Sequence, residues 1–330
     1  MTRISAKYLA QRLVVSYLTI LLIMTLLFAL VRSMPGSFID MMTSPDMTQA
    51  QVQRIRQEWG LNQPLWQQYI DFMINYQMGN FGWSPTRIAP IWQLIKQRLP
   101  RTVILFGGTY LTGIVIGPLV GMYLGWWRGS KKDQTIFTSG LLMYSIPSFW
   151  IAWLFIWAFN YELGWLPSGY MVTQFPEFAW TPISLSVDIL RHLALPIISF
   201  SVIGWVGTML VMRTTMNDVV DSDYVFLAEA KGVSERGVMI KHAARNALIP
   251  VATGALVGVV FILDGSVVLE NVFNYPGMGN LIVTAVLNSD YPITQAVFFV
   301  MAVLIVFMRL LTDGSEEHTS ELQSLSHISY

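Results

Sequence analysis

Six apolar runs, each free of charged residues, alternate with polar stretches along the chain. Each run approaches the roughly 20 residues that an α-helix needs to cross about 30 Å of hydrocarbon. The runs are Leu13–Val31, Thr102–Trp127, Gln134–Tyr161, Leu193–Met212, Asn246–Leu263 and Tyr291–Met308. The pattern predicts an all-α membrane protein with six transmembrane helices. An even number of crossings then places both termini on the same side.

The polar stretches divide the chain into four parts. Residues 1–32 form the N-terminus and the first transmembrane helix, and residues 33–100 form an insert on the opposite side. Within the insert the pattern predicts helices at Met47–Trp59 and Leu65–Met78, joined by a turn at Gly60–Pro64. Residues 101–313 carry transmembrane helices 2–6. The insert is either a cap over the helix ends or a docking surface for an external partner.

The last part, residues 314–330, is polar and without periodicity. Its stretch Ser315–Ser324 reads SEEHTSELQS, which resembles the in-frame translation of a common sequencing-library adapter. We therefore expect the natural sequence to diverge near Asp313 and this tail to be non-native. The alternative is a disordered cytoplasmic tail.

Composition agrees with a membrane protein. The 330 residues are 54% hydrophobic and 12% charged, whereas soluble domains are about 25% charged. Zero net charge provides no basic surface for nucleic acid. The absence of cysteine excludes disulfides and thiolate metal sites. The first apolar run has no small-residue cleavage site, so we read it as a retained helix in the membrane.

Lysine and arginine predict the orientation, because they gather in short cytoplasmic connections. They occur at the N-terminus, in the connection around Lys131 and between Arg213 and Arg245. Neither residue type occurs in Glu162–Leu190 or in Asp264–Asp290. Both termini are therefore predicted to be cytoplasmic in a multi-pass protein of the cell membrane, and residues 33–100 to be external.

Motifs for catalysis are missing. The chain has no GxxxxGK[ST] for nucleotide phosphates, no HExxH and no GxSxG. His192 and His242 are the only histidines before the tail. We expect no catalytic residue, no metal and no cofactor bound by this chain, so any energy source lies in another protein.

The stretch Tyr224–Pro250, here called the polar segment, carries mixed charges between two apolar runs. We predict a helix over Asp218–Lys231 and a left-handed Gly232 that ends it. Ser234 is suited to cap a second helix over Glu235–Arg245. This helix–turn–helix would lie on the cytoplasmic face, where the small residues Ala228, Ala230 and Gly232 allow close approach by a partner.

The polar segment resembles the EAA-type loop of ABC transporter permeases in the dipeptide/oligopeptide subfamily, whose pattern is DYV…A.AKG.SE…HA.RNA.IP. The matching residues are Asp223–Val225, Ala228, Ala230–Gly232, Ser234–Glu235, His242–Ala243, Arg245–Ala247 and Ile249–Pro250. Further matches at Gly60–Tyr69, Arg98–Thr102, Glu270–Leu281 and Asp290–Pro292 extend the resemblance to about Ala10–Asp313. One departure is Phe226, which stands where the general pattern has glutamate.

The resemblance implies a type I importer permease fold, with an EAA coupling loop at residues 214–250 between transmembrane helices 4 and 5. The partners would be a second homologous permease, two cytoplasmic P-loop ATPase subunits that use ATP and Mg²⁺, an external substrate-binding protein and the lipid bilayer. The permease itself would be non-catalytic and would translocate peptides. Residues implied in ATPase coupling are Ala228, Glu229, Ala230, Lys231, Gly232, Ser234, Glu235 and Gly237.

The sequence also singles out three further residues and leaves alternative functions open. Asp264 either lines the translocation path or is hydrated at the outer interface. Glu270 is expected at the interface and His192 at a helix end. The alternatives in function are a secondary transporter or channel, a membrane scaffold, or an ABC importer of a nickel chelate, glutathione or sugar. No internal repeat and no buried charge pair are evident, which disfavours a secondary transporter.

Overall fold

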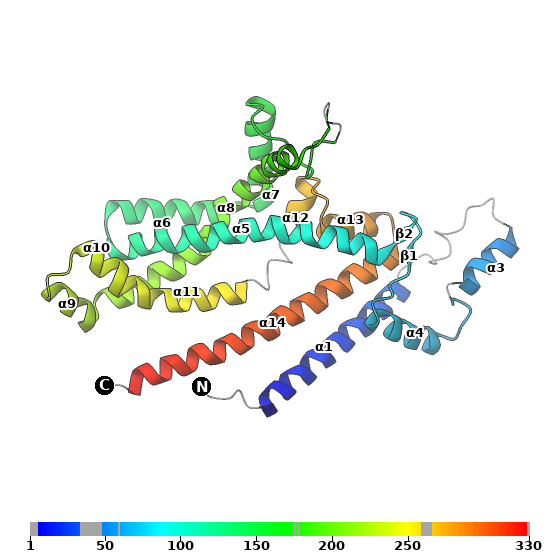
Figure 1. Ribbon diagram of the computed structural model, residues 1–330, viewed down its shortest axis with the longest axis horizontal. Coiled ribbons are helices and arrows are strands. Elements are labelled where there is room, and N and C mark those ends of the chain that lie inside the picture. Colours follow the sequence, from blue (N-terminus) through cyan, green and yellow to red (C-terminus); the bar gives the residue numbers. More distant parts are fainter. Residues whose placement is uncertain are drawn as a thin grey trace. The chain divides into compact units, whose positions relative to one another are not determined.

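The computed structural model describes residues 6–33, 48–58, 60–174, 176, 179–258 and 266–328, and these are mainly helical (Figure 1). The β-structure of this part is one antiparallel pair, β1 (Trp83–Ser84) with β2 (Ala89–Pro90). The chain divides into two compact units. Unit 1 comprises Met1–Arg101 and Pro276–Leu310, and unit 2 comprises Thr102–Tyr275 and Leu311–Tyr330.

Four helices of the described residues are long and apolar enough to cross a membrane. They are α1 (Ala6–Ser33), α5 (Ile91–Trp126), α8 (Pro182–Val220) and α14 (Tyr291–Ile328). They correspond to the first, second, fourth and sixth predicted runs, and they confirm a multi-pass membrane protein. Helix α5 begins at Ile91, well before the second predicted run starts at Thr102.

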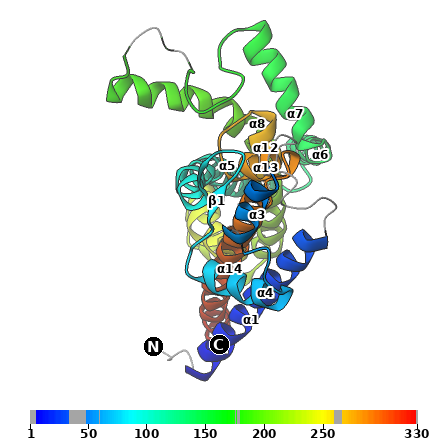
Figure 2. The same ribbon diagram turned by 90° about the vertical axis from the view of Figure 1, so that its right-hand side faces the viewer.

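The third predicted run is bent rather than straight. Helix α6 (Lys131–Tyr144) is followed by α7 (Ser148–Phe155) and the π-helix η1 (Ile156–Glu162), at an angle of 96° to α6. Pro147 lies at the break, where it lacks an amide donor and disfavours a helical conformation at Ile146. Figures 1 and 2 show α7 and η1 turning away from the line of α6.

The fifth predicted run is only partly described. Helix α11 (Ala244–Gly258) has 15 residues, and residues 259–263 lie outside the described part. The described residues therefore provide four spans, or five if the bent pair counts as one.

In unit 1 the predicted insert helices are present as α3 (Gln49–Glu58) and α4 (Leu65–Gln77). Helix α4 packs against α1, with Tyr69 edge-on to Phe28 at 5.4 Å between ring centroids. The β-pair is held by Asp290, which accepts hydrogen bonds from Ser84 and Thr86. Asp290 also accepts from the Ile293 amide at the start of α14, after the short helix α13 (Met278–Leu287).

In unit 2 a row of glycines brings α5 close to α8. Gly113, Gly117, Gly121 and Gly125 recur every fourth residue, which places them on one face of α5. A Cβ on Gly121 would lie 2.8 Å from the Met212 Cβ, and a Cβ on Gly125 would lie 2.9 Å from the Arg213 carbonyl oxygen. Small residues at this spacing are typical of close helix pairs in membranes.

Candidate functional site

The tip of the polar segment is a helix end of defined geometry. Helix α9 (Asp223–Ala230) stops at Lys231, and Gly232 has φ +76°. The Gly232 amide donates to the Glu229 carbonyl at 2.9 Å, and the Val233 amide donates to the Ala228 carbonyl at 3.3 Å. This is a Schellman motif, in which a left-handed glycine satisfies the last carbonyls of a helix. The left-handed turn at Gly232 is confirmed.

The start of α9 differs from the prediction of one helix over Asp218–Lys231. Helix α8 continues to Val220, and a corner at Asp221 and Ser222 separates it from α9. Ser222 has an extended backbone, and its hydroxyl donates to the Val219 carbonyl at 2.6 Å. Serine competes in this way with helical hydrogen bonding, which explains the break.

The second helix is also different. It begins as α10 (Glu235–Gly237), changes to the π-helix η2 (Val238–Ala243), and continues into α11 through Pro250 without a break. The predicted end at Arg245 is therefore wrong. Ser234 occupies the N-cap position, but its side chain makes no capping bond. π-Helices are rare and occur frequently at functional sites.

Most of the side chains predicted for coupling lie on the surface. The side chains of Glu229, Ala230, Lys231, Ser234 and Glu235 are exposed, and so is the backbone of Gly232. Ala228 is 5% exposed and faces inward, so it cannot serve the close approach by a partner that the sequence suggested. Gly237 is half-buried, and a Cβ there would lie 2.9 Å from the Val233 side chain. Ala228 therefore anchors the segment in the interior, whereas residues 229–235 form a contiguous exposed tip.

The anchor belongs to an apolar core beneath the polar segment. This core joins the end of α8, α9, η2 and α11, and its buried members are Met212, Met216, Val225, Ala228, Val238, Met239, Ala243, Ala244, Ala247 and Val251. Such a core joins the tip to α8 and α11 through buried apolar contacts.

Large apolar side chains also reach the surface of the polar segment. Phe226 is 73% exposed, and Leu227 and Ile240 are each more than half exposed. Phe226 stands at the position where the general EAA pattern has glutamate. Exposed apolar groups among charges are typical of protein interaction sites.

Two polar contacts join this region to the end of α5. The Trp126 indole donates to Glu235 at 3.1 Å. Arg128 forms an ion pair of 2.7 Å with Asp221, at the corner before α9. The Arg128 guanidinium holds the pKa of Asp221 below its usual value, and Asp221 in turn raises the pKa of Arg128. These pairings could not be predicted from the sequence, because more than 90 residues separate the partners.

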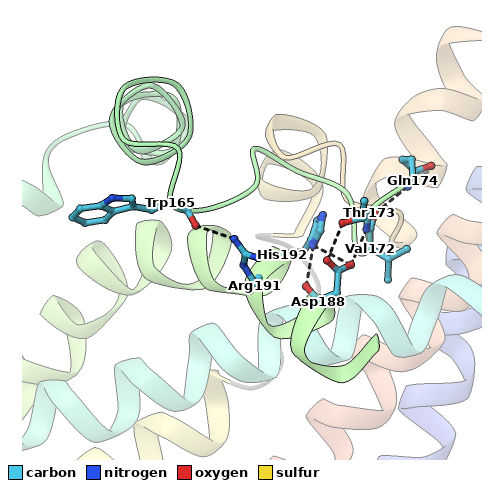
Figure 3. Close-up of polar contacts among 7 residues, drawn as sticks. All are labelled: Trp165, Val172, Thr173, Gln174, Asp188, Arg191 and His192. Atoms are coloured by element: carbon cyan, nitrogen blue, oxygen red, sulfur yellow. Dashed lines mark hydrogen bonds and ion pairs between the residues drawn. The ribbon is translucent and has the colours of Figure 1, made fainter. Parts of the chain in front are cut away.

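A second polar group of unit 2 lies near the start of α8 (Figure 3). The Asp188 carboxylate accepts hydrogen bonds from the amide and the hydroxyl of Thr173, each at 2.8 Å. His192 lies 2.9 Å from the Asp188 carbonyl oxygen through Nδ1, and Arg191 donates to the Trp165 carbonyl. These residues line a cavity of about 250 Å³. They tie the loop after η1 to α8.

Three further residues that the sequence singled out are His192, Glu270 and Asp264. His192 is not at a helix end, because it lies inside α8 and is 5% exposed. Glu270 is fully buried in α12 (Ser266–Val272) rather than interfacial, and it accepts a hydrogen bond from Thr102 at 2.6 Å. Asp264 lies outside the described residues.

Comparison with known proteins agrees with the resemblance seen in the polar segment. Residues 117–320 match the family model for the binding-protein-dependent transport system inner membrane component. Residues 5–106 match the model for the N-terminal part of such membrane components.

Individual relatives match over nearly their whole length. The oligopeptide transport system permease protein AppB of Bacillus subtilis is 33% identical, with 93% of this chain and 96% of the relative covered. The glutathione transport system permease protein GsiC of Escherichia coli K12 is 31% identical, with 93% and 95% covered. The chain therefore belongs to the family of inner membrane components of binding-protein-dependent transport systems.

Proposed function

We propose that this chain is the membrane-spanning permease subunit of an ATP-driven importer that receives short peptides from an external binding protein. The main support is the exposed tip of the polar segment. The last carbonyls of α9 are bonded in the Schellman motif, yet residues 229–235 are all exposed. A tip that is rigid and exposed is suited to contact a second protein and to pass force to the spans.

The energy for transport would come from that second protein. The sequence has no phosphate-binding loop, so ATP and Mg²⁺ would be bound by two cytoplasmic ATPase subunits rather than by this chain. A second, homologous permease would complete the pore. In this arrangement the chain is a non-catalytic subunit, and the residues from Glu229 to Gly237 transmit the motion of the ATPases.

Peptides are the favoured substrate because of the names of the relatives. AppB is an oligopeptide permease and GsiC a glutathione permease. Glutathione is itself built from three amino acids, so both names point to short peptide-like solutes. It is the second candidate substrate.

Transport into proteoliposomes tests the proposal. The permease pair, its ATPase subunits and its binding protein are reconstituted, and uptake of radiolabelled trialanine is compared with that of glutathione. We expect uptake of one of them that requires ATP on the side of the ATPases. Uptake that follows a proton gradient and ignores ATP would instead indicate a secondary transporter.

The orientation has its own test. We expect a reporter enzyme that is active only in the cytoplasm to work when inserted at Ser234, in the exposed turn. The same reporter at Ser168, in the loop after η1, should be inactive. The opposite result would place the polar segment outside, where cytoplasmic ATPases cannot reach it.

A further inference from the structure

A buried ion pair connects α6 to α8 in unit 2. The Asp133 carboxylate accepts two hydrogen bonds from the Arg213 guanidinium, from Nε at 2.7 Å and from Nη2 at 2.9 Å. Asp133 is 1% exposed, and the side chain of Arg213 is 22% exposed. A bidentate pair of this kind fixes direction as well as distance.

The same carboxylate also organises the turn between α5 and α6. It accepts from the Gly129 amide at 2.9 Å, and Gly129 has φ +75°. The Asp133 amide donates to the Ser130 hydroxyl, which caps α6. On the other side, the Arg213 guanidinium lies 4.3 Å from the centre of the Phe137 ring. The pair thus joins the α5–α6 turn, the first turns of α6 and the end of α8.

Helix α6 has few other attachments. Of its 14 residues only Asp133 and Gly140 are buried. At Gly140 the nearest atoms belong to Met209 and Trp205 of α8. With so little apolar contact, the ion pair is the main feature that sets the position of α6 along α8.

The ion pair also lies at the level of the polar segment. Met212 and Met216, which flank Arg213 on α8, belong to the apolar core beneath α9 and η2. A displacement of the polar segment therefore reaches α8 at the turn that holds Arg213.

We infer that Asp133 and Arg213 are positioning residues that make α6 move together with α8 when a partner displaces the polar segment. This inference rests on the proposed function. A bidentate ion pair constrains both the direction and the distance between the two helices.

The absence of cysteine in the chain allows a direct test. Thr135 on α6 and Thr214 on α8 are both exposed, so Thr135→Cys and Thr214→Cys carry spin labels for distance measurement by double electron–electron resonance. We expect one narrow distance distribution in the purified full-length chain in nanodiscs. In the assembled transporter the distribution should stay unchanged when ATP and vanadate are added.

Two substitutions break the pair in different ways. Asp133→Asn removes the charge at constant shape, and Arg213→Lys keeps the charge but cannot form two parallel bonds. We expect both to broaden the distance distribution and to lower peptide uptake per ATP hydrolysed about fivefold to tenfold, in the usual range for coupling between sites. Lys132→Gln is the matched control, because it removes an exposed charge from the same turn of α6 and should leave both measurements unchanged.

Narrow, unshifted distributions in both variants would overturn the inference, as would a wild-type distance that changes with ATP. A variant that fails to fold is recognised by its elution profile, and the second variant then decides. If the assembled transporter moves no peptide, the proposed function fails, whereas the distance measurement on the chain alone still tests the pair.

Discussion

The tip of the polar segment and the loop after η1 share one backbone feature but differ in where their polar side chains point. Both contain a left-handed glycine with open space around it, Gly232 with φ +76° and Gly164 with φ +61°. In the loop, side chains and amides bond to one another, as Thr173 does to Asp188. The loop amide of Tyr170 also donates to the Phe273 carbonyl at 2.9 Å. At the tip, the side chains face outward instead.

This difference indicates that the loop stabilises the fold, whereas the tip is suited to contact a partner. Polar groups that satisfy each other stabilise a loop but leave little to offer a partner. Exposed side chains on a fixed backbone can bind a partner without a large loss of conformational entropy. The comparison therefore indicates that substitutions in the loop change local stability, and that substitutions at the tip change function.

The largest expected effect is that of Gly232→Val. A left-handed conformation costs an L-residue about 1–2 kcal/mol, and a β-branched residue tolerates it least. We expect normal membrane insertion, but uptake and substrate-stimulated ATP hydrolysis at least tenfold lower. Gly164→Val is the matched control, because it carries the same strain in the loop. Equal losses of transport in the two variants would contradict the comparison.

The next effect concerns Phe226→Ala. The side chain is 73% exposed, so its loss should not change the melting temperature of the chain. If it contacts an ATPase subunit, truncation should weaken their binding about 5-fold to 30-fold, as for a buried aromatic anchor of an interface. Tyr161→Ala removes a comparably exposed aromatic at the end of η1 and should not affect this binding. Unchanged affinity in both variants would remove Phe226 from the interface.

A smaller and local effect is expected for Asp188→Ala. The Thr173 amide and hydroxyl then lose their acceptor, at a cost of about 1–3 kcal/mol. Hydrogen exchange at the Thr173 amide should become at least fivefold faster, with ATPase binding unchanged. Ser186→Ala, two residues earlier in α8, should leave the exchange as it is. Slow exchange in Asp188→Ala would mean that the loop is held by other contacts.

The smallest effect is that of pH on the Arg128–Asp221 pair. Because the pKa of Asp221 is lowered in the folded chain, its stabilisation is present above the unfolded value of about pH 4. It is lost as the pH falls through the lowered value. The melting temperatures of wild type and Asp221→Asn should differ slightly at pH 7 and converge at pH 3 or below. A difference that persists in acid would assign it to another cause.

Local features of the site could be predicted because the sequence encodes them locally. Gly232 is the residue that a left-handed helix end requires, and the lysine and glutamate around it are too polar to be buried unpaired. The burial of Ala228 could not be predicted in the same way, because an alanine fits either face of a helix. The four glycines of α5 did carry a signal, since their spacing of four residues is typical of a close helix pair.

Contacts between segments that are far apart in the sequence could not be predicted from it. The sequence showed no buried charge pair, yet Asp133 and Arg213 form one across 80 positions. Asp133 stands among lysines in a connection that composition marks as hydrated, and only the approach of α8 removes it from water. Glu270 was likewise expected at an interface, and its burial depends on Thr102 of a different helix.

The sequence by itself determined the apolar runs, the turn at Gly232 and the family, because these depend on composition, on backbone preference and on residues in order along the chain. Only the tertiary structure decided the 96° bend after α6, the inward face of α9 and the attachment of α6 through Asp133. The physical reason is that helices in membranes are apolar on all sides, so their periodicity does not specify which faces meet.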